Sequence, residues 1–200
     1  MSADPSSFAT NPSIFLRLNA AEARPRELAW DEFRQRYGPI IAGFARKVGA
    51  RPQDVDDVIQ DVLLGFFAKS PTFVYDPSKG RFRGYLKVCT YRALRKRVGQ
   101  NAKFNGVPLE NVESESAEVE QAWNDIWEKD LVRRAMEALR TEMKSNRSFQ
   151  AFEQHVIFDR PAKEVADQLG LHVNSVYRAR EQLSQKLRER LASLRKSCGN

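Results

Sequence analysis

The sequence predicts an all-α protein made of two small helical domains joined by a flexible acidic linker. Apolar residues recur at helical spacing through most of the 200 residues, and the longest strand candidate is the short stretch TFVY. Charge also changes along the chain: residues 26–100 carry 15 basic and 8 acidic side chains, residues 101–127 carry 1 and 6, and residues 128–200 carry 15 and 10. Two basic blocks around an acidic segment indicate two modules that meet a polyanion and a connector that does not.

Composition excludes several classes of protein. The chain has no run of about 18 apolar residues, so we expect no membrane span. Its first residues lack a basic start followed by an apolar run, so we expect no signal peptide and a cytoplasmic location. Cys89, Cys198, His155 and His172 form neither a disulfide framework nor a zinc-binding pattern. We therefore expect no metal and no cofactor.

The first predicted domain covers residues 12–99. Periodic apolar residues predict three helices, and the second helix has the clearest apolar stripe. A loop rich in proline, SPTFVYDPSKG, separates the second helix from the third. The Gly38–Pro39 pair is expected to kink the first helix. The three helices are predicted at residues 26–48, 52–69 and 81–99.

A linker is predicted at residues 100–126 and a second domain at residues 127–196. The linker contains Gly, Pro, Ser and Glu and has no sustained apolar period, which is typical of a flexible connector. The second domain again has helical periodicity. Its helices are predicted at residues 127–145, 148–158, 162–169 and 173–194.

Acidic and amide side chains share the polar face of the 52–69 helix. Clustered carboxylates on one exposed helix lack the enclosed pocket of a metal-dependent nuclease, so we do not expect metal catalysis. From the residues alone, a solvated helix face and a docking face for a basic partner both remain open. The set is Asp54, Asp56, Asp57, Gln60 and Asp61.

The stretch PAKEVADQLGLHVNSVYRAREQL has the layout of a helix-turn-helix. Gly170 supplies the left-handed residue that ends the first helix. The expected buried residues are Val165, Ala166, Leu169, Val176, Ala179 and Leu183. Residues near the start of the second helix reach base edges, and Asn and Arg bind adenine and guanine edges through two hydrogen bonds. The predicted DNA-binding residues are Asn174, Ser175, Tyr177, Arg178 and Arg180.

The segment GRFRGYLKVCTYRALRKR mixes cations with aromatic rings. Single strands bind along positive grooves in which bases stack on aromatic rings, so this mixture favours DNA whose bases have separated. The alternative that both tyrosines belong to the core remains open. The predicted DNA-binding residues are Arg81, Arg83, Tyr85, Lys87, Tyr91, Arg92 and Arg95.

Three motifs in this order resemble the extracytoplasmic-function sigma factors of bacterial RNA polymerase. They are RPQDVDDVIQDVLLGFF, YDPSKGRFRGYL and, after the acidic linker, DRPAKEVADQLGLHVNSVYRAREQLSQKL. The resemblance implies a promoter-specificity subunit and not an enzyme. It implies a region 2-like domain at residues 12–99 and a region 4-like domain at residues 127–196. It also adds His172 to the DNA-binding set, at a position where the family commonly has a serine that caps the recognition helix.

The resemblance also implies partners. The acidic set would dock on the clamp helices of the largest catalytic subunit of core RNA polymerase, and the second domain would meet the flap of the second large subunit. The basic-aromatic segment would melt and read the −10 promoter element, and the helix-turn-helix would read the −35 element as duplex. A nucleoid-associated location follows. An anti-sigma factor is a candidate partner that the residues themselves leave open.

A second function class competes with this one. A stand-alone helix-turn-helix regulator, whose N-terminal helices sense a ligand or dimerise, would bind an operator without polymerase and usually as a symmetric dimer. The high density of cations within residues 26–100 favours the sigma factor, because a sensor domain has no need of them.

Overall fold

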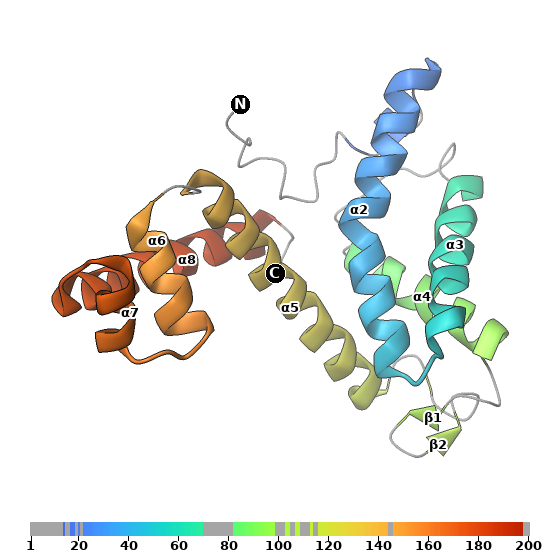
Figure 1. Ribbon diagram of the computed structural model, residues 1–200. Helices are drawn as coiled ribbons and strands as arrows, with labels where there is room; N and C mark the ends of the chain where they lie inside the picture. Colours follow the sequence, from blue (N-terminus) through green and yellow to red (C-terminus); the bar gives the residue numbers. More distant parts are fainter. Residues whose placement is uncertain are drawn as a thin grey trace. The chain divides into compact units, whose positions relative to one another are not determined.

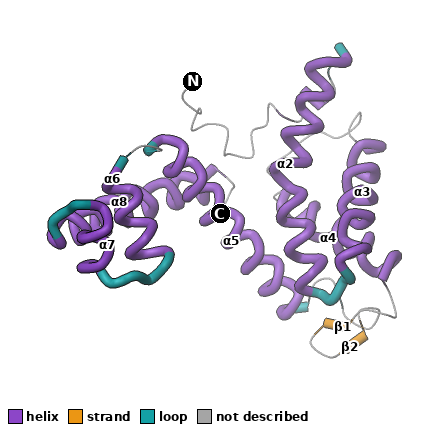
Figure 2. The backbone as a smooth tube through the Cα atoms, in the orientation of Figure 1, coloured by secondary structure: helices purple, strands orange, loops and turns teal. Residues whose placement is uncertain are grey.

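Helices form where apolar residues repeat every three or four positions, and a computed structural model shows how they pack (Figures 1 and 2). The structure describes residues 14, 17–18, 20, 22–69, 82–98, 103–104, 107–108, 113, 116–143 and 146–197. The chain divides into two units, Thr10–Asp130 and Leu131–Asn200, and each is described by itself.

Three helices build the first unit, namely α2 (Ala23–Lys47), α3 (Pro52–Lys69) and α4 (Phe82–Val98). α2 and α3 lie side by side and α4 crosses them (Figure 1). Aromatic rings form the core between them: the Phe33 ring stacks on Phe66 at 4.9 Å between centroids and meets Phe82 edge to face at 5.7 Å. Pro39 lies inside α2, which continues through it as one helix.

A tight turn follows α2. Gly49 has a φ of +87°, and a Cβ placed on it would lie 3.0 Å from the backbone oxygen of Lys103, so only glycine fits this close approach. Lys103 belongs to β1 (Lys103–Phe104), which pairs antiparallel with β2 (Val107–Pro108). Within the described part of the chain, strand structure is limited to these two segments of two residues each, and every other regular element is a helix. The all-α prediction is therefore confirmed.

The linker prediction requires a correction. α5 (Ala117–Glu142) begins inside the range 100–126 that was expected to be flexible. Its buried residues explain the difference, because Val119, Ala122 and Trp123 follow helical spacing and are at most 3% exposed. The boundary between the two units falls between Asp130 and Leu131, which lie within α5.

The second unit contains the C-terminal part of α5 and four further helical segments. These are α6 (Arg147–Phe152), a π-helical segment η6 (Glu153–Ile157), α7 (Ala162–Leu169) and α8 (Val173–Ser197). The amide N–H of Ser148 donates to Oδ1 of Asn146 at 2.7 Å and caps α6. Gly170 ends α7 with a φ of +61°.

The core of this unit contains the apolar residues that sequence periodicity placed inward. Val165, Ala166, Val176, Ala179 and Leu183 are at most 2% exposed. The first four of these residues pack with Ala151 and Ala162 in one cluster, and Leu183 packs with Leu139, Phe149 and Phe152 in another. Leu169 packs on the edge of the first cluster.

Among the described helices, none combines the length and the apolar character that crossing a membrane requires.

Candidate nucleic-acid interface

The acidic set on α3 divides into three parts with different partners. Arg51 forms an ion pair with Asp54, with its Nε 2.8 Å from Oδ2, and this hydrogen bond holds the pKa of Asp54 below its usual value. Arg97 of α4 binds two further carboxylates, at 2.9 Å from Asp57 and 2.5 Å from Asp61. The hydrogen bond from Arg97 likewise lowers the pKa of Asp61. Sequence reasoning did not anticipate this clamp between α3 and α4.

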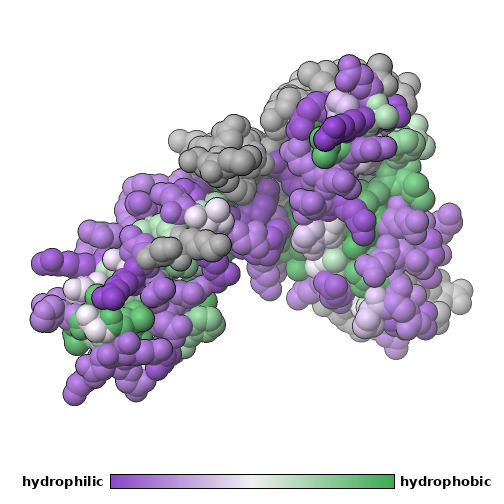
Figure 3. All heavy atoms as spheres, turned by 45° about the horizontal axis from the view of Figure 1, so that its top comes forward, coloured by the Kyte–Doolittle hydropathy of each residue, from purple (hydrophilic) through white to green (hydrophobic). Residues whose placement is uncertain are grey.

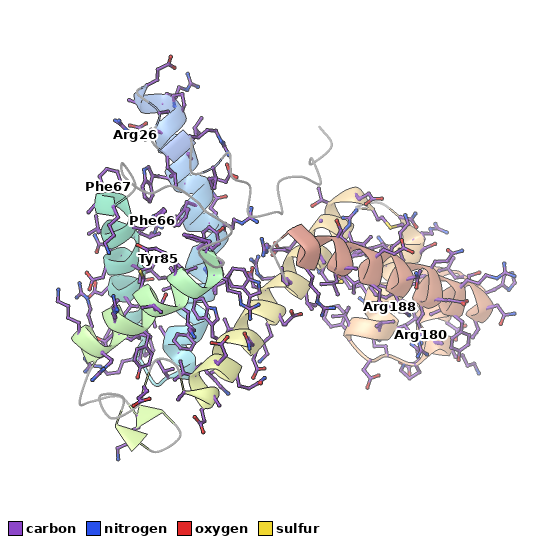
Figure 4. All side chains as sticks on the ribbon, turned by 180° about the vertical axis from the view of Figure 1, so that it is seen from behind. Arg26, Phe66, Phe67, Tyr85, Arg180 and Arg188 are labelled. Carbon is purple, nitrogen blue, oxygen red and sulfur yellow. The ribbon has the colours of Figure 1, made fainter. Side chains whose placement is uncertain are left out.

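The other members of the acidic set face a groove. Asp56 and Gln60 are exposed and, together with Asp57, line a hollow of about 810 Å³ between α2 and α3. Apolar side chains form its rim, and Leu64 and Phe67 are 57% and 51% exposed. Hydrophobic surface is visible among hydrophilic atoms on this unit (Figure 3), and Figure 4 shows Phe67 near one end of α3. The groove thus combines acidic and apolar chemistry.

Sequence reasoning missed the apolar part of this groove. The predicted site residues of this helix are all polar, and the structure adds Phe67, which lies at the surface with its ring centroid 5.0 Å from that of Trp30. The sequence does contain a sign of this apolar surface, namely the width of the apolar stripe on the 52–69 helix. Apolar residues at positions 62, 63, 64, 66 and 67 cover more of the helix than one packing face needs.

The cations of the basic-aromatic segment divide between surface and interior contacts. Arg92 and Arg95 of α4 are exposed, as a DNA-binding role requires. Arg83 and Lys87 are half-buried and contact α5: Lys87 forms an ion pair with Glu120, and Arg83 donates a hydrogen bond to Asn124. Arg81 lies outside the described residues.

The two tyrosines of α4 have different environments. Tyr91 is 2% exposed, so its ring is part of the core and its assignment to the DNA-binding set is corrected. Tyr85 is half-buried, with its ring 6.0 Å from both Phe66 and Phe82 (Figure 4). The pKa of Tyr85 is raised, mainly because the side chain is partly buried and to a smaller extent because of hydrogen bonding with Cys89.

The start of α8 presents the other predicted DNA-binding residues at the surface. The amide N–H of Ser175 donates to the His172 carbonyl oxygen at 2.8 Å, which closes the first turn. The Tyr177 ring is 50% exposed and meets the His155 ring edge to face at 5.8 Å. Figure 4 shows Arg180 and Arg188 projecting from α8. The exposed residues of the predicted set are His172, Asn174, Tyr177, Arg178 and Arg180, and Ser175 is half-buried.

The described residues contain no cluster of three or more His, Cys, Asp or Glu side chains arranged to hold a metal ion. The groove between α2 and α3, the helix α4 and the start of α8 instead present charged groups, aromatic rings and hydrogen-bonding groups. Such surfaces bind partners by complementarity.

Comparisons with known proteins address the first unit most directly. Residues 33–104 match the family described as sigma-70 region 2. No curated protein matches the chain. The solved structure of CnrH in complex with the cytosolic domain of CnrY is similar over 92% of this chain and 97% of that chain, with 20% sequence identity and a TM-score of 0.37. Residues 33–104, which include most of α2 and all of α3 and α4, therefore form a sigma-70 region 2 domain, and the resemblance to sigma factors is confirmed for this part of the chain.

Proposed function

We propose that the chain is a promoter-specificity subunit of bacterial RNA polymerase, a sigma factor of the extracytoplasmic-function class. The observation that carries this proposal is the sigma-70 region 2 match over residues 33–104. That segment includes both the acidic groove and the basic helix α4, so a protein-docking surface and a DNA-binding surface share one domain.

The groove between α2 and α3 supports docking on core polymerase. The groove offers Asp56 and Gln60 beside Leu64 and Phe67. A partner that presents basic and apolar side chains on a pair of packed helices would fit this groove. Charge complementarity steers such an encounter, and apolar contact at the centre of the surface supplies affinity. The clamp helices of the largest catalytic subunit are the proposed partner. Asp57 and Asp61 would join the contact while Arg97 holds their carboxylates in place.

Two DNA-binding surfaces support the recognition of two promoter elements. On α4, the exposed Arg92 and Arg95 would contact phosphates, and Tyr85 would stack against a base of the melted −10 element. On α8, Asn174, Arg178 and neighbouring side chains would read the −35 element in the major groove. Linking the two contacts in one chain raises the effective concentration of the second contact once the first has formed.

Charge reversal at Asp56 tests the docking role. Asp56 is exposed in the groove and is not part of the Arg97 clamp, so Asp56→Lys leaves the packing of α3 on α4 intact. We expect the affinity of the full chain for bacterial core polymerase, measured by fluorescence titration, to fall by at least about tenfold.

Glu118→Lys provides the matched control. It makes the same change of charge at an exposed position on α5, outside the groove, and should leave the affinity for core polymerase near that of the wild type. Equal loss in both variants would remove the groove from the docking surface. Failure of the wild-type chain to bind core polymerase at low salt would refute the proposed function.

A further inference from the structure

Two of the cations that were predicted to bind DNA already have partners inside the first unit. The Lys87 ammonium pairs with the Glu120 carboxylate, and the Lys87 side chain is only 12% exposed. The Arg83 guanidinium donates to Oδ1 of Asn124 and lies over the Trp127 ring, with Cζ 5.1 Å from the ring centroid. All of these partners lie on the N-terminal half of α5.

The N-terminal half of α5 is firmly seated in this unit. Trp123 is 1% exposed, and its ring meets Phe44 of α2 edge to face at 5.1 Å. The approach to α2 is close at Gly43, where a Cβ would lie 3.0 Å from Cγ2 of Ile126. Trp127, which stacks with Arg83, is 2% exposed. The polar contacts to α4 therefore lie at the edge of an apolar interface that holds α5 in register.

The hydrogen-bond acceptors of α5, one carboxylate and one amide oxygen, occupy cations that DNA would also bind. A carboxylate and a phosphate bind an ammonium group through the same charge-assisted hydrogen bonds. The Lys87 side chain is mostly buried and its ammonium pairs with Glu120, so a phosphate that binds this ammonium has to displace the carboxylate. Arg92, more than one turn further along α4, is an exposed cation.

We propose that the N-terminal half of α5 is an internal competitor for DNA at the α4 surface, with Glu120 and Asn124 in the place of nucleic-acid acceptors. This inference rests on the proposed function, since it assigns α4 to DNA binding. DNA gains Arg83 and Lys87 only when their contacts with α5 open. The isolated chain consequently binds DNA more weakly than the number of its cations implies.

The test measures the affinity of the full chain for a mixed-sequence single-stranded oligonucleotide of about 12 nucleotides, a length within the usual site size of such surfaces. Glu120→Gln removes the competing charge and should raise the affinity by about two- to fivefold, the size of an exposed ion pair. Glu118→Gln makes the same change of charge two residues earlier, at an exposed side chain, and should change the affinity less. Adding Lys87→Gln to Glu120→Gln should abolish the gain.

Other outcomes would refute the competition at α4, the binding of single strands by α4 or the proposed function, and the measurements distinguish these cases. Equal gains in Glu120→Gln and Glu118→Gln would mean that net charge alone acts and would refute the competition. A third outcome is that no variant binds the oligonucleotide although the chain still binds core polymerase. In that case α4 does not bind single-stranded DNA, so the inference fails while the docking proposal stands. If the chain binds neither, the proposed function fails and the inference falls with it.

A second readout works without DNA. The Lys87 amine should react with an amine-specific reagent more slowly than that of the exposed Lys96 in the wild-type chain, and Glu120→Gln should narrow this difference. Equal reactivity of the two lysines in the wild type would show that the α5 contact does not hold in solution, and this result would overturn the inference.

Discussion

The helices α4 and α8 both carry cations, and they differ in how many of their sides are covered. α8 packs on α6 and α7 through one apolar stripe, and α5 reaches it further along, where Glu142 pairs with Lys186 and Arg190. The polar face at the start of α8 stays exposed. α4 packs on α2 and α3 and also contacts the N-terminal half of α5, so Arg83 and Lys87 are engaged within the unit. A basic helix thus offers DNA only those cations that its neighbours leave accessible.

The largest expected effect separates the tyrosines of these two helices. Tyr91 of α4 is buried, so Tyr91→Ala should lower the free energy of unfolding by about 3–5 kcal/mol, as for other large aromatic side chains removed from a core. Tyr177 of α8 is half exposed, and Tyr177→Ala should stay within about 0.5 kcal/mol of the wild type. Urea unfolding followed by circular dichroism measures both. Similar losses in the two variants would contradict the contrast between the helices.

The next effect tests whether the exposed face of α8 reads DNA. Arg180→Ala should weaken binding to a duplex that carries the upstream promoter element by about 1–3 kcal/mol without changing stability. Arg188, further along α8 and hydrogen-bonded to Gln185, is the matched control, and its replacement by alanine should reduce binding less. A gel shift with the full chain makes the measurement. If the two variants lose equal affinity, α8 acts through charge alone and does not read bases.

The smallest effect concerns the clamp that joins α3 to α4. Because Arg97 lowers the pKa of Asp61 in the folded chain, the pair stabilises the fold above the ordinary carboxyl pKa of about 4 and loses this contribution as the pH falls through the lowered value. Arg97→Gln should therefore lower the urea concentration at the unfolding midpoint slightly near neutral pH, and by less in acid.

Tryptophan fluorescence during urea unfolding follows this change, because all three tryptophans lie in the first unit. Arg92→Gln is the control, since Arg92 is an exposed cation of the same helix that does not contact these carboxylates. A difference between Arg97→Gln and the wild type that does not vary with pH would contradict the assignment of the stabilisation to the Asp61 pair.

The sequence predicted the inward and outward residues of α8 well because that helix has a single packing face. Val176, Ala179 and Leu183 repeat at three- and four-residue spacing, and the structure buries all three. The remaining positions near the start of the helix are then exposed by default. One stripe of apolar residues therefore determines both the core and the candidate DNA-binding face.

The sequence predicted α4 less well because a second neighbour was not recognised. The glutamates of residues 113–120 gave the segment the composition of a linker, and they concealed the helical spacing of Val119, Ala122 and Trp123. Without α5, the environments of Arg83 and Lys87 could not be assigned. Pairing between distant residues, such as Arg97 with Asp57 and Asp61, depends on how helices cross, and the periodicity of one helix does not encode it.

Selection of promoters from random DNA by core polymerase assembled with this chain tests whether the chain is a promoter-specificity subunit. We expect two sequence blocks at a fixed separation, with the upstream block altered by substitution of Arg178 or Arg180 on α8. We also expect that transcripts start at a fixed distance from the downstream block. A single palindromic block that the chain binds without polymerase would contradict the account and would favour a stand-alone dimeric regulator.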